Sequence, residues 1–209
     1  MSKESIENLR TEYVLSATPC EKGLYLTFDA NNALPIKCRY SEVVIIPLER
    51  LGYYKGPEYQ GFMIVQSLSY HLTNIKIRTG LFAPSYYYDS LQLVKRPAKL
   101  YPCGDAEGDG YSYTNLIEEV KRITIKDKLR AIIIPLDEIK FLDDPLKVGE
   151  ERKFCLSLKK MAKELNLIIF VFLLNNHLWD EWKSATKLIW LERGEGDYAN
   201  ETETAGFFD

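Results

Sequence analysis

Apolar residues occur in this chain as short unbroken runs separated by amphipathic segments. Residues 131–134 and 167–174 are continuous apolar runs, and their length and β-branched content predict parallel strands that are covered on both faces. Between them lies a segment whose apolar residues recur at the spacing of one helical face: Phe154, Leu158, Met161, Ala162 and Leu165. This alternation of strand and helix predicts an α/β protein with a mostly parallel sheet and helices on both faces.

We expect the chain to consist of three parts. We expect an amino-terminal extension over residues 1–40 that adds a hairpin at the sheet edge, a core over residues 41–198, and an acidic tail over residues 199–209. The expected strands of the core are residues 43–46, 76–82, 131–134, 167–174 and 187–191.

Several segments of the core carry a resemblance to a known family. Residues 150–176, EERKFCLSLKKMAKELNLIIFVFLLNN, and residues 185–198, ATKLIWLERGEGDY, resemble parts of the RecA-like core of hexameric replicative DNA helicases of the DnaB type. The runs SEVVIIP, AIIIPLDEIKF and DSLQLVKR resemble further segments of that core more faintly. The resemblance implies a three-layer RecA-like fold.

In that family a glycine-rich loop, a Lys and a Ser/Thr hydroxyl hold the nucleotide phosphates and magnesium. This chain contains no G-x-x-x-x-G-K-[ST] motif, and Pro135 stands where the family has its magnesium-ordering Asp, with Asp137 two residues later. Leu174, followed by Asn175, replaces the Gln that senses the γ-phosphate. The loop itself aligns with six residues that supply neither Lys nor hydroxyl at the required places: Pro57, Glu58, Tyr59, Gln60, Gly61 and Phe62.

These departures predict a vestigial nucleotide pocket without catalytic residues, cofactor or metal. We therefore expect a non-catalytic relative of the family, an assembly or regulatory component in DNA replication or recombination. The alternative is an atypical DNA helicase or ATPase-like enzyme that binds ATP and magnesium weakly.

Tyrosines flank the aligned pocket, at positions 53, 54, 59, 86, 87 and 88. We expect them to fill the former cavity. Stacking on bases or adenine, or contact with a protein partner, are the alternatives.

The net charge of −3 gives no general footprint for nucleic acid, but basic residues are clustered. Lys95, Arg96 and Lys99 form one cluster, and Lys121 and Arg122 begin a second. We expect these to be solvated helix ends and loops, with contacts to nucleic acid or a partner as the alternative.

Arg193 is the candidate for a contact across a subunit interface, because it aligns with an Arg that follows the family's last core strand. The resemblance implies self-association or association with a related helicase-like protein. The four cysteines have no C-x-x-C spacing, so we expect no metal site, and without a leader or a membrane span we expect a cytoplasmic protein.

Overall fold

The computed structural model describes residues 15–28, 35–48, 57–85, 98–103, 112–136, 139, 148–173, 187–189 and 191. For residues 57–62 and 148–151 it describes the backbone alone.

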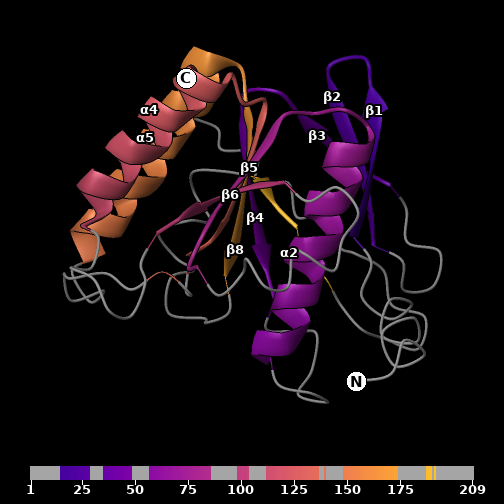
Figure 1. Ribbon diagram of the computed structural model, residues 1–209, viewed down its shortest axis with the longest axis horizontal. Helices are drawn as coiled ribbons and strands as arrows, with labels where there is room; N and C mark the ends of the chain where they lie inside the picture. Colours follow the sequence, from indigo (N-terminus) through magenta and orange to yellow (C-terminus); the bar gives the residue numbers. More distant parts are fainter. Residues whose placement is uncertain are drawn as a thin grey trace.

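A six-stranded parallel sheet forms the centre of the molecule (Figure 1). Its strand order is β6-β5-β7-β8-β4-β9, with parallel pairing throughout. The strands are β4 (Glu42–Pro47), β5 (Thr79–Ala83), β6 (Lys99–Pro102), β7 (Ala131–Pro135), β8 (Ile168–Leu173) and β9 (Lys187–Leu188). The predicted α/β class with a parallel sheet is confirmed.

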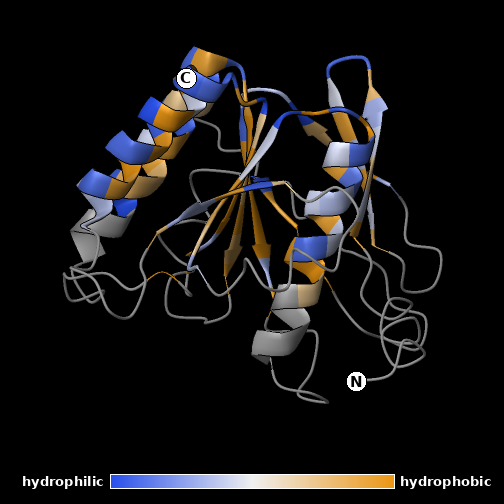
Figure 2. Ribbon diagram, viewed as in Figure 1, coloured by the Kyte–Doolittle hydropathy of each residue, from blue (hydrophilic) through white to orange (hydrophobic). Residues whose placement is uncertain are grey.

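Two separate apolar clusters cover the two faces of this sheet, because successive side chains of each strand point to opposite sides. In β4, Val44 and Ile46 belong to one cluster, whereas Val43 and Ile45 belong to the other. Helix α2 (Pro57–Asn74) packs on the first face, and α4 (Tyr113–Asp127) and α5 (Val148–Leu165) pack on the second. Figure 2 shows the apolar strands in the centre and hydrophilic positions along the outer sides of α4 and α5.

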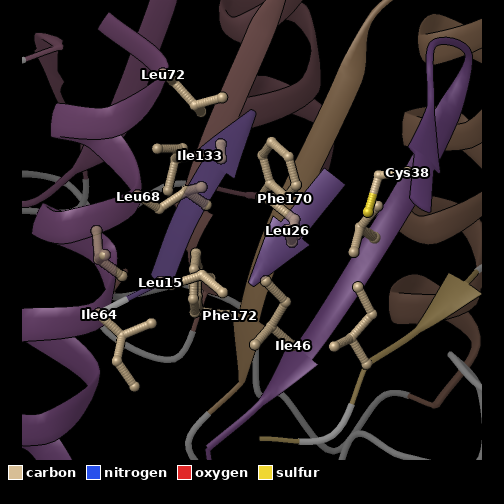
Figure 3. Close-up of a cluster of buried hydrophobic side chains, with 14 of the residues drawn as sticks. Leu15, Leu26, Cys38, Ile46, Ile64, Leu68, Leu72, Ile133, Phe170 and Phe172 are labelled. Carbon is tan, nitrogen blue, oxygen red and sulfur yellow. The ribbon is translucent and has the colours of Figure 1, made fainter. Parts of the chain in front are cut away.

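The amino-terminal strands form a sheet of their own. The strands β1 (Leu15–Cys20), β2 (Gly23–Phe28) and β3 (Ile36–Arg39) pair antiparallel in the order β1-β2-β3. They do not extend the parallel sheet at its edge. Instead, Leu26 of β2 packs beside α2 against Phe170 and other residues of one face of the parallel sheet (Figure 3). The first face is therefore covered by a helix and a small sheet together.

The helix boundaries follow local signals. Ser112 caps α4, because its hydroxyl accepts a hydrogen bond from the Asn115 amide, and Lys128 ends the helix in a left-handed conformation. Lys76, also left-handed, follows α2, and the Ile77 amide donates back to the Leu72 carbonyl. Within the described part of the chain, no helix combines the length and apolar composition needed to cross a bilayer.

Candidate functional site

The carboxyl ends of β4, β8 and β7 lie side by side at one end of the parallel sheet. We call the border formed by these strand ends the carboxyl edge of the sheet. Pro47 at the end of β4 is level with Leu173 of β8, and Pro135 at the end of β7 is level with Phe172. In open α/β sheets, ligands bind in the crevice outside the carboxyl ends of the strands, where connections leave in opposite directions. The chain leaves β4 through α2 on one face and leaves β7 through α5 on the other, so this edge is the candidate site.

The strand ends at this edge are apolar and buried. Pro47, Pro135 and Leu173 are all buried, and the residues that follow the first two, Leu48 and Leu136, are 3% and 1% exposed. The Leu48 amide donates to the Leu173 carbonyl at 2.9 Å, which holds the ends of β4 and β8 together. These five residues offer neither a carboxylate for magnesium nor a cation for phosphate.

Helix α2 begins near the same edge because it follows β4 through a short connection. Its first six residues, Pro57 to Phe62, are those that align with the phosphate loop of the resembled family. A helix start carries unpaired amide groups and a partial positive charge, which attract anions. The side chains of these six residues lie outside the described set, as do Asp137, Leu174, Asn175 and the tyrosines at positions 53, 54 and 86–88.

A shallow groove of about 150 Å³ lies between α4 and α5 on the second face. The rings of Tyr113 and Phe154, with centroids 5.0 Å apart, and the side chain of Ile117 form its apolar part. Ligand pockets for drug-sized molecules are usually about 300–1,000 Å³, so this groove is too small for a nucleotide. The residues that line it are Tyr113, Thr114, Ile117, Glu118, Lys153, Phe154 and Ser157.

Among the predicted basic contacts, Lys99 is paired with an acid. It lies on β6 and its Nζ is 2.7 Å from a carboxylate oxygen of Asp127 at the end of α4. The Tyr101 hydroxyl donates to the same oxygen. Hydrogen bonds from Lys99 and Tyr101 hold the pKa of Asp127 below its usual 3.8, and burial together with the Asp127 contact raises the pKa of the Tyr101 phenol.

Lys121 and Arg122 are paired as well. Lys121 Nζ lies 3.1 Å from a Glu164 oxygen, which links α4 to α5, and Arg122 makes two hydrogen bonds to Glu119 one turn earlier. The hydrogen bond from Arg122 lowers the pKa of Glu119. Exposed ion pairs such as these are what solvated helix surfaces carry. Lys95, Arg96 and Arg193 lie outside the described residues.

The Lys99–Tyr101–Asp127 cluster was not predicted from the sequence. β6 was not among the expected strands, and Asp127 lies 26 residues after Tyr101, so no local sequence pattern connects them. Within the described ranges, no three His, Cys, Asp or Glu side chains gather as the ligands of a metal ion would.

Together, the fold and the site define an α/β protein with a parallel six-stranded sheet, flanked by helices and apolar at the carboxyl ends of its central strands. No protein-family model matches the chain, and no curated protein matches it.

Proposed function

We propose that this chain is a non-catalytic relative of the RecA-like core of DnaB-type helicases, which acts by assembly in DNA replication or recombination. In this proposal the chain associates with itself or with a related protein and does not turn over ATP. The resemblance of residues 150–176 and 185–198 motivates the family, and the arrangement of the strands supports it.

The supporting feature is that three segments far apart in the sequence leave the sheet at one place. The resemblance assigns the phosphate loop, the magnesium-ordering residue and the γ-phosphate sensor to segments that follow β4, β7 and β8, respectively. In the sheet these three strands are consecutive and parallel, so the three segments leave from one edge. Segments far apart in the sequence are thereby brought to one place, as a nucleotide pocket of that family requires.

The proposed absence of ATP turnover rests on the apolar residues at that edge of the sheet. Pro135 is buried at the end of β7, where the resembled family needs a carboxylate for magnesium, and it is flanked by buried apolar residues. Magnesium prefers oxygen ligands, and removing a charge from water into such surroundings is costly. An apolar strand end of this kind favours packing over phosphate chemistry.

Turnover measurements test the proposal. Purified protein with ATP, magnesium and single-stranded DNA should release phosphate no faster than a blank without protein. Asp137 is the carboxylate nearest in sequence to the lost position, so it is the residue to substitute. If the chain does not turn over ATP, Asp137→Ala should be indistinguishable from the unaltered chain. DNA-stimulated turnover that Asp137→Ala abolishes would refute the proposal and favour the atypical ATPase.

A further inference from the structure

The outer side of α5 carries a concentrated positive charge in a chain whose net charge is −3. Five basic residues and one leucine lie within an arc of about 120° on the helix and span about 16 Å along it. We call this surface the α5 basic face, and it consists of Arg152, Lys153, Leu156, Lys159, Lys160 and Lys163. Five of the six are exposed and Lys159 is half-buried.

Leu156 stands at the centre of the α5 basic face. It is 50% exposed, and its neighbours at three and four residues on either side, which adjoin it on a helix surface, are all basic. Ile125 on the neighbouring helix α4 is 55% exposed and has Lys121, Arg122 and Lys128 at the same spacings. These are the large apolar side chains that stand exposed among the described residues, and basic residues adjoin both, although Lys121 and Arg122 beside Ile125 are paired with Glu164 and Glu119.

The combination of positive charge and an exposed leucine favours one class of binding partner. A bilayer requires an apolar helix face to insert, but the apolar face of α5 is buried against the sheet through Phe154, Leu158 and Met161. A phosphate backbone is bound by cations and gains little from an exposed leucine. A protein segment that is acidic and also carries apolar side chains satisfies both the charge and Leu156.

One segment of this chain has that composition. Residues 194–209, GEGDYANETETAGFFD, contain Glu, Asp, Tyr and two adjacent Phe residues, and contain neither Lys nor Arg. We propose that the α5 basic face binds residues 194–209 of a second copy of the chain. Reciprocal exchange of the segment between two copies gives a closed dimer, because each copy supplies one segment and one basic face.

This inference rests on the self-association in the proposed function, and it adds the surface and the partner segment. Glu164 is the acid at the border of the α5 basic face, and it already lies 3.8 Å from Lys160 and 3.1 Å from Lys121. Because Lys160 and Lys121 already lie near Glu164, the test variants alter Lys159, Lys163 and Leu156.

Sedimentation of the 209-residue chain at low salt should give about twice the 24.2 kDa mass of one chain. K159E/K163E and L156S should each weaken dimerisation, by about tenfold and about fivefold respectively. The matched control K22E/K37E makes the same charge change on exposed residues of the small sheet and should remain dimeric. Circular dichroism checks that each variant is folded.

A charge exchange identifies the partner segment. K159E/K163E lowers the side-chain charge of the α5 basic face from +5 to +1, and E201K/E203K changes that of residues 194–209 from −5 to −1, so each variant alone should dimerise more weakly than the unaltered chain. An equimolar mixture of the two should dimerise more strongly than either variant alone, because in a heterodimer the unaltered segment of one copy meets the unaltered basic face of the other. A monomeric unaltered chain, a dimer insensitive to these changes, or a mixture that dimerises no better than the separate variants would each overturn the proposal. So would duplex DNA that binds the α5 basic face equally well with and without Leu156, since that shows a phosphate ligand.

Discussion

Two glycines in strands occupy positions where a side chain has no room, for different reasons. A Cβ at Gly23 would lie 1.9 Å from the carbonyl oxygen of Cys38, which is backbone of the paired strand β3. A Cβ at Gly80 would lie 2.6 Å from a methyl group of Leu129 and 3.0 Å from the Tyr101 ring, which are side chains that can move. Backbone in a paired strand yields less readily than the end of a side chain.

We therefore expect Gly23→Ala to destabilise the protein more than Gly80→Ala. Overpacking usually costs about 1–3 kcal/mol, and we place Gly80→Ala at about 1–2 kcal/mol and Gly23→Ala at about 3 kcal/mol or more. Urea unfolding of the two variants, followed by circular dichroism, measures the difference. Equal losses would show that the β2–β3 pairing adjusts as easily as the Leu129 side chain.

The Tyr101–Asp127 contact predicts how stability depends on pH. The folded-state pKa of Asp127 is depressed, so its contribution is present above pH 3.8 and is lost as the pH falls through the folded pKa below that value. The folded-state pKa of Tyr101 is raised, so its contribution is present below its usual value of 10.0 and is lost as the pH rises above it.

Tyr101→Phe should therefore lose less stability above pH 10 than the unaltered chain. In acid, the loss of stability that accompanies protonation of Asp127 should also be smaller in this variant. Denaturant midpoints measured from pH 3 to pH 11 test this, with Tyr70→Phe as the control on a half-buried tyrosine elsewhere. If the alkaline loss is unchanged in Tyr101→Phe, the phenol does not titrate against Asp127.

Among the elements, β1 and α2 are joined by the hydrogen bonds of one hydroxyl in addition to apolar packing. Ser67 on α2 accepts a hydrogen bond from the Leu15 amide at 2.7 Å and donates to the Leu15 carbonyl at 3.0 Å. Both backbone groups belong to the first residue of β1, so this one side chain fixes the start of the small sheet to the helix. Loss of a partner leaves buried polar groups unsatisfied.

Ser67→Ala should cost about 1–2 kcal/mol and should raise the exchange rate of the Leu15 amide hydrogen more than those of β8. Thr73→Ala is the control on the same helix, because the Thr73 hydroxyl bonds only the Ser69 carbonyl of its own helix, at 2.9 Å. Unchanged protection of the Leu15 amide in Ser67→Ala would contradict the role of this contact.

The predicted strands were most accurate where a single local sequence pattern determines the position of the strand. Continuous apolar runs located β4, β7 and β8 to within one residue at each end, because strands buried on both faces exclude polar residues throughout. β5 begins three residues later than predicted, since the amides of residues 75–77 donate back to carbonyls of α2 and close its end. β6 was not predicted, because its four residues include exposed Lys99 and end in Pro102.

At the scale of the whole molecule, the sequence could not supply the strand order or the place of the small sheet. Both depend on contacts between distant segments, such as the packing of Leu26 and Leu68 against the face of the parallel sheet. The candidate site was predicted only as far as the resemblance placed its segments. That Pro47, Leu173 and Pro135 end neighbouring strands together follows from the sheet and not from any one segment.

A thermal-shift titration tests most directly the proposal that this edge of the sheet does not bind nucleotide as the pocket of an active DnaB-type helicase does. A ligand at one hundred times its dissociation constant stabilises the folded state by about 2.7 kcal/mol, which for a chain of this size raises the melting temperature by about 5–10 °C. We predict that about 1 mM ATP with magnesium changes the melting temperature by less than about 1 °C. A rise of several degrees that requires both ATP and magnesium would contradict the account.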